Sequence, residues 1–191
     1  MKRSWLYVIV SLLLLWGIAL PSWAQQERPS AGMKPPRSGI RAELLTDLET
    51  LEKKLVGLAE AMPEEKYTWR PAEGVRSVSE VYMHIAGANF FFPRLVGVEP
   101  PPGATRGLEK ITEKTKVVET LKRSLHHVRQ AILNTPDADL DKPVKMFGRD
   151  TTVRAVLIAL ITHMHEHLGQ SIAYARMNGV VPPWTAARQS R

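Results

Sequence analysis

One uninterrupted helix-period segment, residues 151–177, constrains the fold of this 191-residue chain more than any other feature. Asp150 or Thr151 can cap its first turn, and Asn178-Gly179 ends it. At roughly 1.5 Å per residue, the segment forms a helix about 40 Å long. Its apolar residues recur at helical spacing, which indicates that this long face packs against other helices.

Three further helix-period segments precede it, and Pro- and Gly-rich connections separate all four. They cover residues 39–62, 77 to 92 or 95, and 112–134. Ser77 and Glu80 have the spacing of a capping box at the start of the second segment. Residues 144–147 can form a short extended piece, but there are no convincing alternating strands and no internal repeat. The sequence therefore predicts an all-α fold, an up-down four-helix bundle.

The first 24 residues have the pattern of a secretory signal peptide. A basic pair precedes a continuous apolar stretch over residues 5–20, and Ser22 and Ala24 suit cleavage before Gln25. The alternative is an uncleaved membrane anchor, but the stretch is shorter than the ~20 residues that comfortably span a bilayer. We therefore expect a periplasmic or secreted protein that is cut after Ala24.

The mature chain, residues 25–191, is long enough for one domain. We assign residues 25–38 to a flexible linker, 39–184 to the helical bundle and 185–191 to a C-terminal tail. The absence of cysteine excludes disulfides, thiolate ligands and lipid attachment at a lipobox. Removal of Lys2 and Arg3 lowers the formal net charge from +7 to +5, a scattered excess that does not favour nucleic acid as a partner.

Three histidines form the candidate functional site. His163 and His167 lie one helical turn apart in the last long helix, where they replace core residues on an otherwise apolar stripe. A buried imidazole needs a hydrogen bond or a metal ion, and two at this spacing can share one ion. His84 lies in the middle of the second helix. Its spacing fits a core histidine with hydrogen-bond partners and a third metal ligand about equally well.

The other histidines are expected to lie outside this site. His165 is about 200° from His163 around the helix, which predicts a structural or interface residue. His126 and His127 are adjacent in the third helix and face different ways, so we expect both to be solvated.

Three neutral imidazoles suit Zn²⁺ in particular, with Ni, Fe, Mn or Cu as alternatives. Three protein ligands leave at least one position for water or substrate, and such water can be a hydroxide near neutral pH. Glu166 is the nearest candidate base, or a carboxylate that flanks the ligands. Gln170 could orient a ligand or the water. Tyr82, Asn89, residues 90–92 and Tyr174 are candidate pocket residues, and their spacing does not fix which of them face inward.

Two segments resemble the DinB-like family, the DinB/YfiT superfamily. MPEEKYTWRPAEGVRSVSEVYMHIAG is similar to the family's entry into the second helix, and HMHEHLGQSIAYARMNGVVPP to its C-terminal signature. The resemblance covers residues 39–184. It implies a four-helix bundle with a right-handed topology, a metal ion held by His84, His163 and His167, and a homodimer.

Three functions remain as hypotheses. The first is an exported, metal-dependent, hydrolase-like enzyme with an unknown small-molecule substrate. The second is a non-catalytic module in which the ion staples the bundle. The third is a thiol-dependent transferase, as in characterised relatives of the family, but their thiol cofactors are cytoplasmic and an exported chain would not meet them. No Gly-rich phosphate loop, serine elbow or paired carboxylates are visible, so nucleotide, acyl-serine and glycosidase chemistries have no support.

Overall fold

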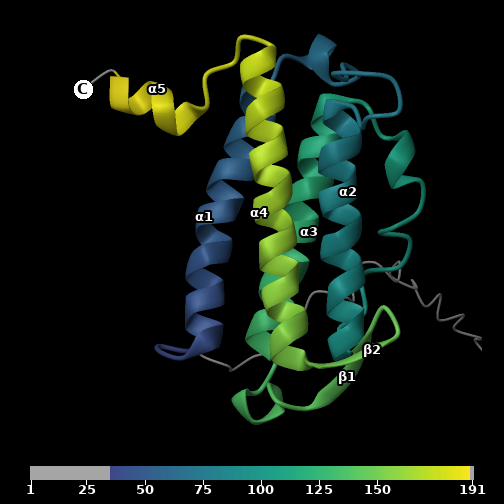
Figure 1. Cartoon of the computed structure of the whole chain (residues 1–191), viewed down its shortest axis with the longest axis vertical. Helices are drawn as coiled ribbons and strands as arrows, with labels where there is room; N and C mark the ends of the chain where they lie inside the picture. Colours follow the sequence, from purple (N-terminus) through teal and green to yellow (C-terminus); the bar gives the residue numbers. More distant parts are fainter. Residues whose placement is uncertain (1–34, 190–191) are drawn as a thin grey trace, which may run out of the picture. The chain divides into compact units, whose positions relative to one another are not determined.

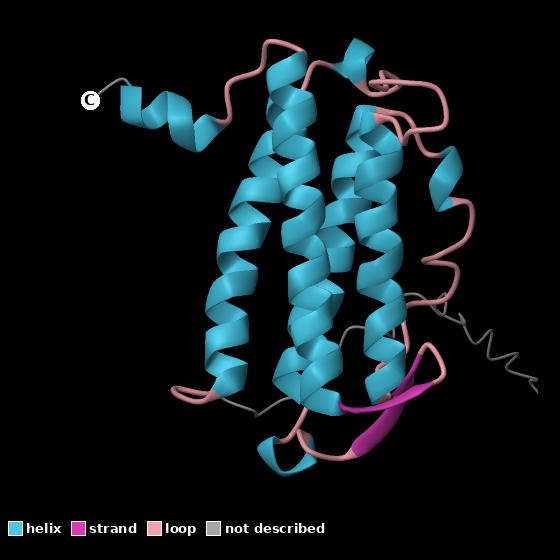
Figure 2. Cartoon of the chain, viewed as in Figure 1, coloured by secondary structure: helices cyan, strands magenta, loops and turns pink. Residues whose placement is uncertain are grey.

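The computed structural model describes residues 35–189, in which four long helices form a bundle (Figure 1, Figure 2). These helices are α1 (Ile40–Ala61), α2 (Val78–Phe91), α3 (Lys114–Asn134) and α4 (Val153–Met177). A hairpin of strands β1 (Pro143–Met146) and β2 (Arg149–Thr152) precedes α4, and the short helix α5 (Pro183–Gln189) follows it. The predicted all-α fold is confirmed. The predicted signal peptide and most of the predicted linker lie outside the described residues.

The apolar stripes seen in the sequence face the centre of the bundle. The buried leucines of α1 stand three and four positions apart, at positions 44, 48, 51, 55 and 58. Val117, Leu121 and Leu125 of α3 are buried at the same spacing. Burial of each such side chain stabilises the fold by roughly 1.5–3 kcal/mol relative to leaving it in water. The helices are therefore held together mainly by apolar packing.

The order of the helices around the bundle differs from the up-down arrangement that the sequence predicted. Helices α1 and α2 each pack against both α3 and α4. Helices α2 and α3 run in the same direction, and so do α1 and α4 (Figure 1). Side-chain contacts agree with these directions, because Lys114 at the start of α3 donates to the Glu60 carbonyl at the end of α1, 2.8 Å away.

The connection between α2 and α3, residues 92–113, explains this difference. It begins as a 3₁₀ helix, Phe92–Val96, and then runs back alongside the bundle before α3 starts (Figure 1). The up-down prediction assumed that the chain reverses after each helix. Because it instead returns to the end where α2 began, α2 and α4 become antiparallel neighbours.

The capping box predicted at the start of α2 is present. Ser77 Oγ accepts a hydrogen bond from the Glu80 amide at 3.3 Å, and the Glu80 carboxylate accepts one from the Ser77 amide at 2.8 Å. Arg70 also bonds to this carboxylate, at 2.9 Å. The first turn of α2, the helix that carries His84, is thus fixed to the preceding loop.

The connection before α4 forms a hairpin, where the sequence predicted one extended piece. The strands pair antiparallel, and Phe147 and Gly148 form the two-residue turn between them. Their φ angles are 52° and 79°, and positive values at both positions are typical of a type I′ turn. Strand β2 includes Asp150 and Thr151, so the predicted cap is wrong by one or two residues. Thr152 caps α4 instead.

Helix α4 ends before Asn178-Gly179, as predicted, and Gly179 adopts a φ of 74°. The chain then forms α5, a helix that was not predicted and that lies largely in the segment assigned to the C-terminal tail. This helix packs against α1, with Lys54 Nζ 5.9 Å from the centre of the Trp184 ring. None of the helices in residues 35–189 combines the length and the apolarity that crossing a membrane requires.

Candidate metal centre

His84, His163 and His167 meet between α2 and α4. Since the two helices are antiparallel neighbours, the middle of α2 lies against the middle of α4. His163 and His167 are one turn apart on α4 and share one face, and the His84 ring lies opposite them. All three side chains are half-buried, so the group lies partly open to solvent.

The distances within this histidine group fit a single ion. His84 Nε2 and His163 Nε2 are 3.1 Å apart, and one nitrogen from each of the three rings lies within 4.8 Å of the other two. Divalent zinc binds imidazole nitrogen at about 2.0–2.1 Å, so two ligands of one ion stand roughly 3–3.5 Å apart. Among the described residues, no aspartate, glutamate or cysteine joins the group. The three histidines are therefore placed to hold a metal ion.

Two of these imidazoles are held in the neutral form that a metal ligand requires. Burial lowers the pKa of His84 to about 4, and the charges of Arg76, His167 and His163 act in the same direction. Burial also lowers the pKa of His163 to about 4, followed by the charges of His167 and Arg76. At neutral pH both rings therefore keep a free lone pair.

A chain of hydrogen bonds orients His167. Tyr174 Oη donates to the Arg76 carbonyl at 3.1 Å, so it accepts from Gln170 Nε2, also at 3.1 Å. This arrangement turns Gln170 Oε1 toward His167 Nδ1, 2.8 Å away. Because an amide oxygen only accepts, Nδ1 carries the proton and Nε2 presents its lone pair. Partners of this kind typically fix the ring of a metal-ligating histidine.

His163 has fewer protein partners than a buried imidazole normally has. Its Nδ1 is buried and has no hydrogen-bond partner among the described residues, and its Nε2 faces another imidazole. The Phe92 ring lies 6.0 Å from the His163 ring. Most buried polar atoms are hydrogen-bonded, and a ring left this incompletely paired suits ligation of an ion. The donor set therefore fits a metal ion.

Glu166 and Gln170, the candidate catalytic residues, have different surroundings. Glu166 is exposed and does not belong to the histidine group, so its role as a base stays a prediction. Gln170 lies against the outer nitrogen of His167. This position suits a residue that orients a ligand, and that role also stays a prediction.

The remaining histidines lie apart from the group. His165 is exposed, and its Nε2 lies 3.0 Å from both carboxylate oxygens of Asp47 on α1. His126 is exposed, as expected. The prediction of a solvated His127 is wrong, because this side chain is buried with its ring 5.6 Å from that of Phe90. The parallel packing of α2 on α3 covers His127.

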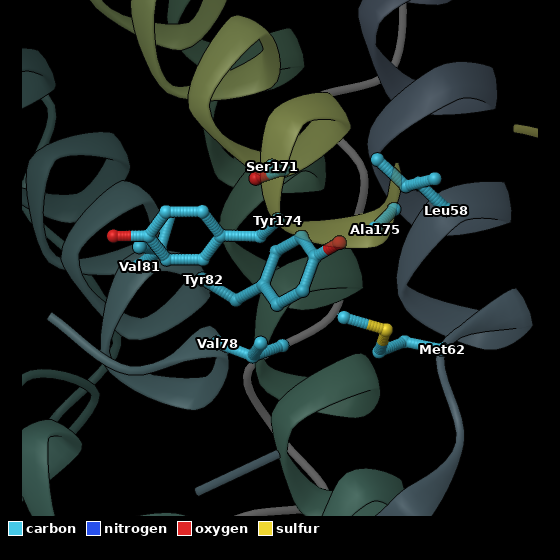
Figure 3. Close-up of a pocket in the computed structure, with 8 residues that line it drawn as sticks. All are labelled: Leu58, Met62, Val78, Val81, Tyr82, Ser171, Tyr174 and Ala175. Carbon is cyan, nitrogen blue, oxygen red and sulfur yellow. The ribbon is translucent and has the colours of Figure 1, made fainter. Parts of the chain in front are cut away.

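The candidate pocket residues divide between two sides of α2. Asn89 and Phe90 face α3, where Asn89 Nδ2 donates to Ser124 Oγ at 3.0 Å. Tyr82 is buried and, with Tyr174, lines a small, mainly apolar pocket bounded by α1, α2 and α4 (Figure 3). None of the three histidines lines that pocket. Of the candidates, Phe92 lies next to His163, and Tyr174 is joined to His167 only through Gln170.

Sequence reasoning missed Arg76 and Phe147. The backbone carbonyl of Arg76 ends the hydrogen-bond chain, and its charge acts on two of the histidines. Phe147 packs on Phe92, which in turn lies against His163. The only available signal was a single phenylalanine before a glycine in a polar connection, and such a signal does not indicate what the ring contacts.

Comparisons with known proteins show the family and the fold of the chain. A family model described as the DinB superfamily matches residues 47–171, a range that includes all three histidines. A DinB-like protein from Bacillus cereus is similar in structure, with a TM-score of 0.67 and 20% identity, over 73% of this chain and 93% of that one. A DinB-like protein from Bacillus subtilis has a TM-score of 0.57 and 22% identity over the same shares. The search of curated proteins gives no match.

The fold and the site together define a four-helix bundle with a three-histidine group between two antiparallel helices. The family match spans well over half of the chain. The chain belongs to the DinB superfamily.

Proposed function

We propose that the protein binds one divalent metal ion through His84, His163 and His167 and uses it in a hydrolase-like reaction on a small molecule. The observation that supports this proposal is the convergence of three imidazoles, with one nitrogen of each within 4.8 Å of the others. Zinc is the ion we favour because it suits three imidazole ligands, with Ni, Fe or Mn as the alternatives.

The surrounding residues have separate tasks in this proposal. Gln170 keeps the proton of His167 on Nδ1, away from the other two rings. Burial and the Arg76 charge keep His84 and His163 unprotonated. An ion in such a site acts as a Lewis acid and lowers the pKa of water to about 7. Glu166, exposed and three residues after His163, is the residue that we propose takes up a proton.

Titration of purified, chelator-treated protein with Zn²⁺ tests the metal site. Calorimetry should give one ion per chain, and His84→Ala should bind the ion at least tenfold more weakly. His165→Ala is the matched control, since this histidine lies on the same helix but pairs with Asp47. It should keep the stoichiometry and affinity of the unaltered protein. Equal binding by the His84→Ala variant would overturn the proposed ligand set.

A second candidate function is a metal-stapled module without turnover. The observation that favours it is the position of the group, which links α2 to α4 and would hold the two helices together. Azide added to the Co²⁺-loaded protein separates the two proposals. A change in the visible spectrum supports an open, enzyme-like site. An unchanged spectrum, together with a melting temperature that falls on chelation, supports the staple.

We also propose that the protein is exported and cleaved after Ala24. The support is the sequence pattern of residues 1–24 alone. N-terminal sequencing of the protein from fractionated cells should give Gln25 in the exported fraction. An intact N-terminus in the cytoplasm would contradict export and return the thiol-dependent transferase to consideration.

A further inference from the structure

Three phenylalanines from two separate segments form a cluster beside the histidine group. Phe147, in the turn of the hairpin, stacks on Phe91 with ring centres 5.9 Å apart and an angle of 16° between the planes. The ring of Phe92 meets Phe147 edge-on at 6.0 Å. Phe92 is buried, whereas Phe91 is 39% and Phe147 71% exposed. The cluster therefore offers aromatic surface to solvent.

The backbone of Phe147 is in an unfavourable conformation. Its φ of 52° lies in the left-handed region, and among the described residues it is the only one other than glycine with a positive φ. Type I′ turns strongly prefer asparagine, aspartate or glycine at this position, because a bulky side chain crowds the backbone there. Unfavourable backbone conformations that persist in a native fold are concentrated at functional sites and ligand clamps. The turn thus carries an aromatic ring where turn formation alone would favour another residue.

The cluster is continuous with the candidate metal centre. Phe92 contacts Phe147 on one side and His163 on the other, each with 6.0 Å between ring centres. The Phe147 ring therefore lies within 12 Å of the His163 ring. The buried Phe92 ring thus joins the exposed Phe147 ring to His163 through two ring contacts.

The exposed area suits a small molecule better than a second copy of the chain. An aromatic side chain has roughly 150–250 Å² of surface, so the exposed parts of Phe91 and Phe147 together offer roughly 200 Å². A stable protein–protein interface needs about 800 Å² from each partner. One planar ring of a ligand covers an area of the size available here.

We infer that Phe91, Phe92 and Phe147 form the aromatic wall of the substrate site and receive a planar, apolar group of the substrate. This inference rests on the proposed function, since it takes the histidine-bound ion as the place where the polar end of the substrate binds. Offset-stacked or edge-to-face contacts with exposed rings are the arrangement that a planar group adopts on such a wall.

Two hydroxamates that differ only in their apolar group test the wall. Benzohydroxamate and acetohydroxamate carry the same metal-binding head, and their dissociation constants for the Zn²⁺-loaded protein can be measured by calorimetry. We expect the protein to prefer benzohydroxamate, and this preference to fall by about three- to tenfold in Phe147→Asn. Phe91→Ala should have the same effect. Acetohydroxamate binding and zinc content should not change in either variant.

Control variants separate recognition from folding. Asparagine suits the turn backbone, so Phe147→Asn should unfold at nearly the same temperature as the unaltered protein. Phe147→Tyr keeps the ring and should keep the preference for benzohydroxamate. Trp184→Ala removes an aromatic ring from α5, away from the histidines, and should leave the preference as it is.

The outcomes distinguish failure of the wall from failure of the proposed function. If both hydroxamates bind and Phe147→Asn keeps the full preference, the aromatic wall is wrong while the metal site stands. If neither hydroxamate binds the zinc-treated protein, the proposed function fails and the wall fails with it. If the two phenylalanine variants change the oligomeric state instead of the preference, the cluster is a contact between copies of the chain.

Discussion

At the scale of single residues, Gln170 has the clearest effect on the site. Its amide oxygen holds the proton of His167 on Nδ1, and Tyr174 and the Arg76 carbonyl hold the amide in that orientation. The chain thus presents Nε2 of His167 as a ready ligand. Without this acceptor the ring would be free to rotate and to place its proton on either nitrogen.

Replacement of Gln170 tests this role. Gln170→Leu should weaken zinc binding about 10- to 100-fold, because it removes the acceptor that fixes the tautomer of His167. Gln170→Glu keeps an acceptor and should lose much less. Competition titration with a chromogenic chelator measures both affinities. If the leucine variant binds zinc as tightly as the unaltered protein, the hydrogen bond does not position the ligand.

At the scale of secondary-structure elements, the capping box stabilises the start of the helix that carries His84. In the capping box, side-chain oxygens accept from two backbone amides, those of Ser77 and Glu80, and Arg70 forms an ion pair with the Glu80 carboxylate. His84 is seven positions after Ser77, which is about two helical turns. One intact helical turn would therefore still separate His84 from a first turn that has lost its order.

The variant Ser77→Ala should lower the free energy of unfolding by about 1 kcal/mol, because it removes the side-chain acceptor of the cap. Ser77→Thr retains a capping hydroxyl and should lose less. Urea denaturation followed by circular dichroism measures the change. Zinc affinity should stay within about twofold in both variants, since the rest of α2 remains packed. A large loss of zinc affinity in Ser77→Ala would mean that the cap itself holds the site in place.

The elements that local signals define could be predicted from the sequence. The leucine spacing of α1, the capping box of α2 and the stop at Asn178-Gly179 each depend on a few neighbouring residues. The hairpin and the burial of His127 could not be predicted in this way. Strand β2 forms because β1 is beside it, and His127 is buried because α2 covers it. Contacts between distant segments leave little trace in local spacing.

At the scale of the whole molecule, one part of the candidate site follows from local spacing and another part from contacts between distant segments. The spacing of His163 and His167 predicted that they share a face, but His84 joined them only through the family resemblance. Physically, their meeting depends on the path of residues 92–113, which makes α2 and α4 neighbours. The predicted homodimer also depends on contacts beyond one chain, and it stays a prediction.

The stability of the metal-free protein should depend on pH through the histidine group. His84 and His163 have pKa values lowered from 6.5 to about 4, chiefly by burial, with Arg76 and His167 as the nearby charges. Between pH 6.5 and pH 4, the unfolded chain binds protons at these two histidines that the folded chain does not bind. The contribution of these histidines to the free energy of unfolding should therefore be constant above pH 6.5. It should lower that free energy as the pH drops from 6.5 toward 4.

Urea denaturation with chelator present, at several pH values from 7 to 4, measures this slope. The double variant His84→Asn with His163→Asn should show a shallower slope over the same range. The buried His127, whose pKa is also lowered by burial, remains in both proteins, so its contribution cancels in the comparison. Identical slopes in the two proteins would contradict the assignment of this pH dependence to His84 and His163.

The separation of the histidines along the chain also has a consequence for the rate of unfolding. His84 and His163 are 79 positions apart, so an ion that joins them closes a long loop. Bringing together two points this far apart costs much chain entropy. The two histidines therefore meet only once α2 and α4 have largely packed. An ion at the site would therefore leave the folding rate almost unchanged and slow unfolding instead. In this protein, metal would act on the lifetime of the native state more than on the speed at which it forms.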